Sequence, residues 1–470
     1  MDSATYTRDF WQAKAGALKF RTQHFIDGSY VASADGRTFP TINPATGATI
    51  TEVARGGEAE IDRAVAVARK AFKSGSWSRL DPRARMAVLE KFSALVEAHA
   101  EEFAVLDSLD MGKPVMDMMN IDIPGSVTSL KFFAETIDKI EGAVTATAAN
   151  ALHYILRQPL GVVGLIVPWN YPLMMAAWKL GPALATGNSV VLKPAEQSPL
   201  SANLLAELFI EAGGPSGVLN VVHGLGEEAG KALALHNDVD KIAFTGSTEV
   251  GKLLMIYSGQ SNMKRVSTEC GGKTPQIILG DYDDLDTAVT YAVNGIYGNQ
   301  GEVCNAGSRI LVQKNIHDDF VERFTARTRE NFVLGDPLDP STTIGPLVTS
   351  SHQKLYRHRP QGRRIAALRR RHPGCGPGRR LCRADAVHRR RQFDADRPRG
   401  NFRPGRHHHP DRRHGGCHRD RQRQRLRSRR LDLDPRHLEG ASFRPRHRGR
   451  RRLGQLLRPW RHDLDLGWLQ

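Results

Sequence analysis

The sequence contains little cysteine, and the few cysteines are unevenly placed. Of the 5 cysteines in 470 residues, only Cys270 and Cys304 precede residue 357. This excludes, for that part of the chain, a disulfide framework of the kind that stabilises small secreted proteins. The scarcity favours a reducing, cytoplasmic setting.

The sequence also lacks a long apolar run. A membrane-spanning helix needs roughly 18 to 20 consecutive apolar residues, and the N-terminal MDSATYTRDFWQAKAG has no apolar core of the kind that a signal peptide needs. The most apolar region, residues 161–192, is interrupted by Pro168, Asn170, Pro172, Lys179 and Pro182. We therefore expect this region to form buried strands and helices, and we expect no contact with a membrane.

Lysine is absent from residues 357–470, which contain 35 arginines and only 10 acidic residues, a net charge of +25. The chain up to Tyr356 has 32 basic and 40 acidic residues, a net charge of −8. The pI near 9.9 thus reflects the last quarter of the sequence. It gives no reason to expect the acidic body to bind nucleic acid.

The stretch RPRGNFRPGRHHHPDRR, from Arg397 to Arg413, illustrates this basic tail. Three interpretations are open: a nucleic-acid-binding arm, a histidine-rich metal site, or a segment that was never selected as protein. The adjacent His407, His408 and His409 have no sign of a folded scaffold that would orient them around a metal. We favour the third interpretation and expect no metal site.

The body has the pattern of an α/β protein. Residues from Phe25 onward alternate short β-type runs with turn residues, and two amphipathic helices are expected after residue 57. Four strand-turn-helix units then follow, beginning GVVGLIVPWN, NSVVLKP, GVLNVVHG and KIAFTG. This alternation predicts a doubly wound parallel sheet, which binds ligands at the carboxyl ends of its strands. A second, shorter α/β stretch begins near Thr274.

Four motifs fall at these predicted strand ends: VPWNYP, VLKPAEQSP, FTGSTEVG with VSTECGGKTP, and GNQGEVCNAGSR. In order and spacing, across essentially the whole body, they resemble the aldehyde dehydrogenase superfamily. The phrases WQAKA, GPSGVLNVVHG and SNMKRV resemble more narrowly the branch of gamma-glutamyl-gamma-aminobutyraldehyde dehydrogenases of putrescine breakdown. The resemblance implies NAD-dependent oxidation of an aldehyde, of the aminoaldehyde type, to a carboxylic acid.

The resemblance assigns three catalytic residues. Cys304 is expected to attack the aldehyde as a thiolate, giving a thiohemiacetal and then a thioester, although a free cysteine in isolation is more often a small buried apolar residue. Asn170 matches the side-chain donor to the oxyanion, and Glu269 matches the general base that activates water. Cys270 stands where the family has an apolar residue, so we expect a structural role for it.

The chain lacks a G-x-G-x-x-G fingerprint after a strand, and the resemblance implies a different NAD site. Lys193 and Glu196 resemble the contacts to the adenosine ribose, and the carboxylate favours NAD over NADP because it repels a 2′-phosphate. Gly246 and Ser247 are expected to present free backbone N–H groups to the pyrophosphate. The remaining expected cofactor contacts are Pro168, Trp169, Gly226 and Thr245. The expected lining of the substrate tunnel is Tyr171, Met175 and Trp178.

The resemblance also implies a domain plan. We expect an NAD-binding domain over residues 1–268, with an oligomerisation hairpin at about 141–160, and a partial catalytic domain over residues 269–356. Members of the family are dimers or tetramers that act on a small-molecule aldehyde, and the resemblance implies no specific nucleic acid partner.

The tail from residue 357 has no legible family motif. Residues 398–410, PRGNFRPGRHHHP, are compatible with codons that, read one base later, encode REEIFGPVVTII, which contains the family's EEIFGPV motif. Residues 452–470 similarly accommodate a second family segment in a shifted frame. The sequence therefore suggests a frameshift close to Tyr356, followed by a disordered arginine-rich tail. We call the protein with the family's frame resumed there the frame-restored chain.

Two functions compete. The first is the NAD-dependent aldehyde dehydrogenase. The second is a truncated, non-catalytic product whose basic tail binds polyanions nonspecifically. Loss of binding with rising salt and absence of NADH production would favour the second.

Overall fold

A computed structural model describes residues 6–357 of the chain. Apart from Arg357, the last residue of α13 (Ser350–Arg357), the predicted arginine-rich tail lies outside the described residues. So do the histidine triplet and the shifted-frame motifs.

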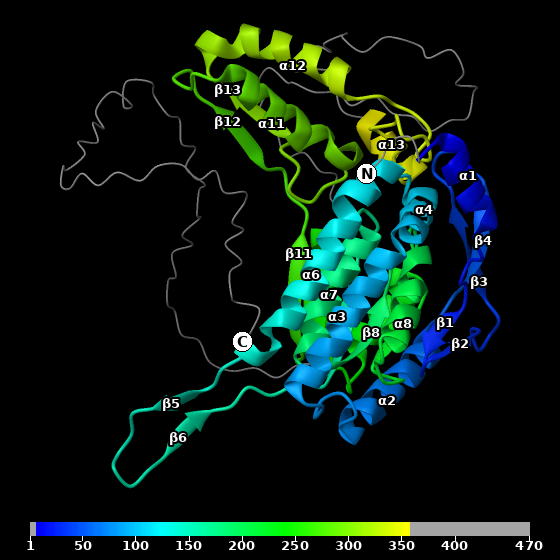
Figure 1. Cartoon of the computed structure of the whole chain (residues 1–470), viewed down its shortest axis with the longest axis vertical. Coiled ribbons are helices and arrows are strands. Elements are labelled where there is room, and N and C mark those ends of the chain that lie inside the picture. The colour runs from blue at the N-terminus through cyan, green and yellow to red at the C-terminus, as the bar shows by residue number, and fades with distance from the viewer. Residues whose placement is uncertain (1–5, 358–470) are drawn as a thin grey trace, which may run out of the picture. The chain divides into compact units, whose positions relative to one another are not determined.

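The centre of the fold is a seven-stranded sheet (Figure 1). Its five parallel strands confirm the predicted doubly wound sheet, while the N-terminal hairpin extends one edge in the antiparallel sense. In spatial order the strands are β11 (Arg265–Cys270), β10 (Lys241–Gly246), β7 (Val162–Ile166), β8 (Ser189–Lys193), β9 (Leu219–Val221), β1 (His24–Ile26) and β2 (Ser29–Val31).

Strands β7 and β8 are buried along their whole length, because helices cover both faces of the sheet. Successive side chains of a strand point to opposite faces. Val163 and Leu165 accordingly join one core cluster, whereas Val162 and Ile166 join another. Both faces being apolar explains why these strands read as continuous hydrophobic runs.

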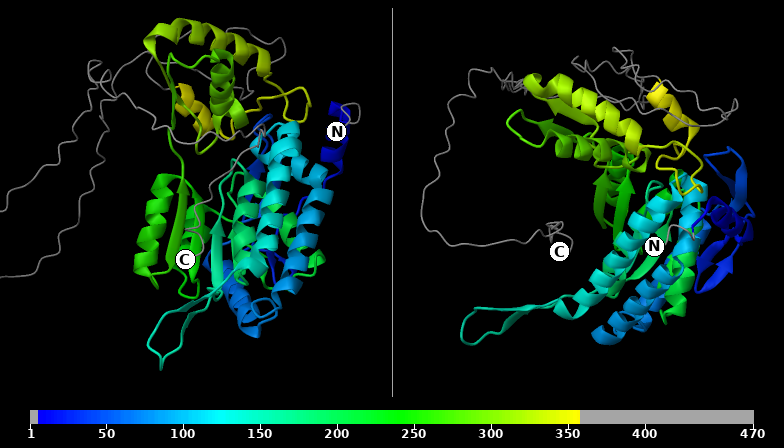
Figure 2. Two further views of the ribbon diagram at one scale, coloured as in Figure 1. Left: turned by 60° about the vertical axis from the view of Figure 1, so that its left-hand side comes forward. Right: turned by 45° about the horizontal axis from the view of Figure 1, so that its top comes forward.

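Helices pack on each face according to their apolar stripes. One face carries a layer that includes α3 (Pro82–Ala98), α6 (Ile123–Thr136), α7 (Pro172–Ala185) and α8 (Leu200–Glu211) (Figures 1 and 2). The other carries α2 (Glu58–Ser74), α9 (Lys231–Leu235) and α10 (Thr248–Gln260). The remaining helical segments of this region are α1 (Arg8–Ala17), α4 (Ala100–Met111), α5 (Val115–Asp117), η1 (Met118–Asp122), η2 (Ile137–Lys139) and η3 (Gly226–Gly230).

Local sequence sets where the helices begin. The Asp81 carboxylate caps α3 by accepting a hydrogen bond from the Arg83 backbone N–H at 2.9 Å, and Pro82 occupies the first helical position. Glu60 accepts the Gly57 N–H at 2.8 Å at the start of α2. That helix ends at Gly75, whose φ of 81° is left-handed.

Two hairpins lie outside the large sheet. β3 (Thr38–Ile42) pairs with β4 (Thr49–Ala54). β5 (Ala143–Thr145) pairs with β6 (His153–Ile155) and extends away from the helices (Figures 1 and 2). The second pair lies within residues 141–160, where the oligomerisation hairpin is expected. Its oligomerisation role stays a prediction, although Val144 and Leu152 are about three-quarters exposed.

A smaller α/β region follows β11. β12 (Pro275–Ile278) and β13 (Arg309–Val312) form a two-stranded parallel sheet, and α11 (Leu285–Tyr297) and α12 (His317–Asn331) enclose a separate apolar cluster with it. The short helices η4 (Gly298–Gly301) and η5 (Lys314–Ile316) lie between these elements. The domain boundary at residue 268 stays a prediction, since Glu269 still belongs to the last strand of the large sheet.

The longest helices within residues 6–357 have 17 residues. None of the helices in this range is both long and apolar enough to cross a membrane.

Candidate active site

Three of the predicted motifs meet at one edge of the large sheet. Strands β7, β10 and β11 run parallel, so the residues at their carboxyl ends lie at the same edge. Asn170 follows β7, Thr245 lies near the end of β10, and Glu269 lies opposite Thr245 in the register of β11. Pro168, Trp169 and Asn170 are half-buried, whereas Glu269 is exposed.

Cys304 comes to this edge from the smaller region. The backbone N–H of Gly272, three residues after Glu269, donates a 2.8 Å hydrogen bond to the Cys304 carbonyl oxygen. Cys304 itself is exposed, as a reactive thiol needs to be. Cys270 is only partly exposed and packs against the apolar cluster under α10, which fits the structural role expected for it.

The loop before Cys304 has an unusual backbone. Asn299, Gln300 and Gly301 have φ values of 49°, 58° and 76°, and for the first two residues this left-handed conformation costs on the order of 1 kcal/mol each. Side-chain amides stabilise it. Asn299 Nδ2 donates to the Asn170 carbonyl oxygen at 3.1 Å, and Gln300 Nε2 donates to the Gly112 carbonyl oxygen at 3.1 Å.

Asn170 makes a direct contact with this loop. Its Nδ2 donates to the Glu302 carbonyl oxygen at 2.7 Å, two residues before Cys304. An amide nitrogen has two N–H donors, so one remains for the predicted oxyanion contact. The structure adds a second role to the prediction, because Asn170 also holds the loop that carries the thiol.

Lys179 is a site residue that the sequence reasoning missed. It lies on α7 with 7% of its surface exposed, and its Nζ donates to Thr245 Oγ1 at 2.6 Å. Burial lowers the pKa of Lys179 to about 8, and the charge of Glu269 opposes this effect. A lone lysine in the apolar run MMAAWKLGPALA was the available signal, since a buried ammonium needs a polar partner.

Glu302 was also missed. Its Oε1 accepts the Val348 N–H at 3.3 Å, while its Oε2 is buried without a hydrogen-bond partner among the described residues. Burial raises the pKa of Glu302 to about 8, against the weaker opposing effects of the Val348 N–H and of Lys113. No sequence pattern indicated that this carboxyl is buried, because a glutamate in a glycine-containing loop is usually solvated.

The predicted cofactor residues lie at the ends of neighbouring elements. Lys193 Nζ and Glu196 Oε2 are 3.0 Å apart just beyond β8. Burial opposes ionisation of Glu196, but the charge of Lys193 and the hydrogen bonds to the carboxylate keep its pKa below the usual value. Glu196 is therefore an anion at neutral pH.

Ser247 is the N-cap of α10, where its Oγ accepts the Val250 N–H at 3.2 Å. The backbone turns there from β10 through Gly246 into a 13-residue helix, an end that favours an anion. Gly226 begins η3 and is exposed, with no atom within 4 Å of where a Cβ would lie, so the space beside it is open. Trp169 packs beside His352, with ring centroids 4.8 Å apart.

The predicted tunnel residues share one face of α7. Tyr171 precedes the helix and Met175 and Trp178 follow at helical spacing. Tyr171 and Met175 are half-buried, and Trp178 is 52% exposed. Their position beside Asn170 fits the prediction that they line a path to Cys304, which stays a prediction.

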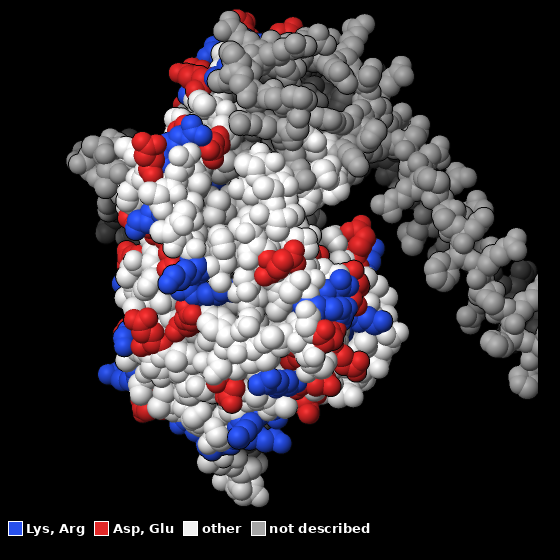
Figure 3. Space-filling model, turned by 90° about the vertical axis from the view of Figure 1, so that its right-hand side faces the viewer, with Lys and Arg blue, Asp and Glu red and all other residues white. Residues whose placement is uncertain are grey.

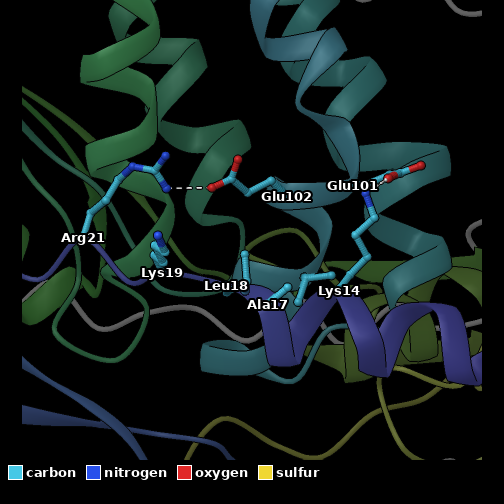
Figure 4. Close-up of a pocket in the computed structure, with 8 residues that line it drawn as sticks. Lys14, Ala17, Leu18, Lys19, Arg21, Glu101 and Glu102 are labelled. Carbon is cyan, nitrogen blue, oxygen red and sulfur yellow. Dashed lines mark hydrogen bonds and ion pairs between the residues drawn. The ribbon is translucent and has the colours of Figure 1, made fainter.

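A separate pocket of 340 Å³ lies between α1 and α4 (Figure 4). Four of its charged residues form ion pairs, Lys14 with Glu101 at 2.5 Å and Arg21 with Glu102 at 2.6 Å. It contains none of the predicted site residues. Where the face drawn in Figure 3 shows described residues, it likewise mixes both signs of charge and has no continuous basic patch.

Comparisons with known proteins identify the family of the chain. Residues 30–361 match the aldehyde dehydrogenase family. The chain is 50% identical over 343 residues to the NADP/NAD-dependent aldehyde dehydrogenase PuuC of Escherichia coli (strain K12), covering 73% of this chain and 69% of that protein.

Two solved structures are similar over 74% of this chain and 70% of their own, each with a TM-score of 0.73. One is an indole-3-acetaldehyde dehydrogenase complexed with NAD+, 51% identical. The other is the gamma-glutamyl-gamma-aminobutyraldehyde dehydrogenase of Burkholderia cenocepacia, 49% identical. With a family match over most of its length and relatives at this identity, the chain belongs to the aldehyde dehydrogenase family.

Proposed function

We propose that the frame-restored form of this protein oxidises an aminoaldehyde to the carboxylic acid with NAD+, through a covalent intermediate on Cys304. The observation that carries the proposal is the pair of hydrogen bonds that bring the motifs together, from Gly272 to Cys304 and from Asn170 to Glu302. They join the thiol loop, the proposed oxyanion donor and the segment of the proposed base at one edge of the sheet.

The residues present fit NAD+. The Lys193–Glu196 pair offers a carboxylate to the two ribose hydroxyls, and the α10 N-terminus at Gly246 and Ser247 offers backbone N–H groups to the pyrophosphate. The open space beside Gly226 leaves room for the adenine. When bound, the nicotinamide accepts the hydride that the oxidation releases.

The chemistry on the protein side starts at Cys304. Its thiolate attacks the aldehyde carbon, and the carbonyl oxygen becomes an oxyanion that the free N–H of Asn170 stabilises. Oxidation of this thiohemiacetal leaves a thioester on Cys304. Glu269 then removes a proton from a water molecule, the water oxygen attacks the thioester carbon, and the acid leaves as Cys304 regains its thiolate.

One relative supports the aminoaldehyde class, because the Burkholderia cenocepacia structure is named for gamma-glutamyl-gamma-aminobutyraldehyde. The narrower sequence phrases indicate the same branch. A higher kcat/KM for an ω-aminoaldehyde than for the alkyl aldehyde of equal length would support this class, and equal values would contradict it.

The mechanism is tested at the thiol. In the frame-restored chain, Cys304→Ala should reduce aldehyde oxidation by at least about a thousandfold, in the range reported for loss of a catalytic nucleophile, and should leave NAD+ affinity within about twofold. Cys270→Ala is the matched control, because it removes the other thiol of the body and should keep turnover. Near-normal turnover by Cys304→Ala would contradict the assignment.

A further inference from the structure

A buried ion pair lies against Tyr171, one of the residues proposed to line the substrate path. Lys113 and Asp122 are each 1% exposed at the side chain, and Lys113 Nζ donates to Asp122 Oδ2. The same Nζ lies 3.5 Å from the centroid of the Tyr171 ring. The ammonium therefore contacts a carboxylate and the face of an aromatic ring, two partners that suit a cation removed from water.

A contribution to stability does not by itself explain why a buried ion pair is present here. Desolvating two charges costs several kcal/mol per ion, and an apolar pair of equal volume is often as stable or more so. Burial raises the pKa of Asp122 even though Lys113 opposes this effect. The pair can instead fix positions. The Asp122 carboxylate holds the ammonium in place, and the ammonium contacts the Tyr171 ring.

The backbone around Lys113 is anchored to the thiol loop as well. Gly112 ends α4 with a φ of 82°, and its carbonyl oxygen accepts the hydrogen bond from Gln300 Nε2, four residues before Cys304. A Cβ at Gly112 would lie 2.7 Å from Pro346 Cγ and 2.9 Å from Pro44 Cγ. One dipeptide thus contacts the loop that carries the thiol and the aromatic ring next to Asn170.

Tyr171 lies where its orientation matters for substrate. It directly follows Asn170 and is half-buried at the start of α7. Burial raises the pKa of its hydroxyl, and the charges of Asp122, Asp117 and Cys304 raise it further, so the ring lies near both the acidic residues and the thiol.

We infer that Lys113, held by Asp122, is a positioning residue that fixes the Tyr171 ring in the wall of the substrate path to Cys304. This inference rests on the proposed function, because only that function makes the path a route for substrate. The contact between Lys113 and the ring is observed independently of it. Lys113 does not touch the reacting atoms and acts through Tyr171.

The first test measures the environment of the Tyr171 ring directly, by ¹⁹F NMR on the full 470-residue chain. Tyrosines are replaced by 3-fluorotyrosine, and the ¹⁹F signal of Tyr171 is assigned by its loss in Tyr171→Phe. Because Lys113→Met alone would leave the Asp122 carboxylate buried without its cationic partner, the test variant is Lys113→Met/Asp122→Asn. We expect its Tyr171 signal to shift and broaden. Lys264→Met is the matched control, since it removes another buried ammonium, bonded to Ala234 O and Ser261 Oγ, and should leave the signal unchanged.

The second test is a mutant cycle in the frame-restored chain. The double variant should raise the aldehyde KM about tenfold, as expected for a desolvated cation–π contact, with kcat changed less than about threefold. In a Tyr171→Leu background the same double change should no longer affect KM, because the ring through which it acts is absent.

An unchanged ¹⁹F signal, or a KM effect that persists without the ring, would overturn the inference. Failure of the proposed function is distinguishable, because it would show as turnover by Cys304→Ala while the ¹⁹F result is unaffected.

Discussion

At the scale of single residues, the charge of Glu196 is the feature of the proposed cofactor site with the clearest consequence. The carboxylate is ionised and bonded to Lys193. A 2′-phosphate on the ribose would place like charges close together, which costs affinity.

We therefore expect Glu196→Gln to narrow the preference for NAD+ over NADP+ by about tenfold, the effect of roughly 1.4 kcal/mol. The measurement is the ratio of dissociation constants for the two cofactors. Glu58→Gln, an exposed change at the start of α2, should leave the ratio unaltered. If Glu196→Gln also leaves it unaltered, the discrimination lies in other residues.

Glu302 gives a prediction for pH. Its pKa of about 8 in the folded protein lies above the ordinary value of 4.5, so between these pH values the folded state holds a proton that the unfolded state releases. Stability from this group is fully present below pH 4.5 and falls as the pH rises to 8, by up to about 1.4 kcal/mol per pH unit.

Glu302→Gln cannot titrate and should lack this part of the slope. We expect the difference in free energy of unfolding, variant minus parent, to increase by about 2 kcal/mol between pH 5.5 and 7.5. Denaturant titration at the two pH values measures it. Parallel pH dependences in the two proteins would show that the carboxyl does not hold its proton.

At the scale of elements, the sequence predicted most of what local pattern determines. Continuous apolar runs predicted β7 and β8, and strand-helix alternation predicted the parallel sheet, because each signal lies within one element. The strands β1 and β2 lie where short β-type runs were expected, from about Phe25 onward, but their place in the large sheet was not expected. The sheet is joined through β1, whose Phe25 pairs with Val221 of β9, a contact between residues far apart in the sequence.

The same limit explains which site residues were found. Cys304, Glu269 and Asn170 stand in motifs that the family shares, so they were predicted without a fold. Lys179, Glu302 and Lys113 act through contacts with other elements. Their burial depends on tertiary packing. No local sequence pattern indicates whether a single charged residue is buried.

The turn after α4 is an element that supports the site from a distance. Gly112 has a left-handed backbone, and a Cβ there would collide with Pro44 and Pro346. Gly112→Ala should destabilise the protein by about 1 to 3 kcal/mol and disturb the Gln300 contact. Gly259→Ala in α10 has open space around it and should instead stabilise by up to about 1 kcal/mol. Equal effects of the two changes in thermal unfolding would contradict this account.

At the scale of the whole molecule, the sheet of the smaller α/β region has one face that no element of residues 6–357 covers. Ile277 on β12 is 65% exposed and Leu311 on β13 is 54% exposed, although both lie in a parallel sheet, a type normally covered on its two faces. The family match ends at residue 361, and the chain covers only 69% of PuuC. A shifted reading frame near Tyr356 would account for the exposed sheet face and for the partial family match, because the family's remaining strands and helices would then be missing from this sequence.

We accordingly propose that the 470-residue chain has no measurable aldehyde dehydrogenase activity and that the frame-restored chain has it. The physical reason is that exposed apolar surface of this kind promotes association of partly folded chains, and a single domain is normally stable by only about 5 to 15 kcal/mol. Both proteins should be expressed side by side, with NADH production and the soluble fraction measured, and the gene resequenced around the codon for Tyr356. NADH production by the 470-residue chain at the rate of the frame-restored chain would contradict the proposal, and residues 357–470 would then have to be treated as functional protein.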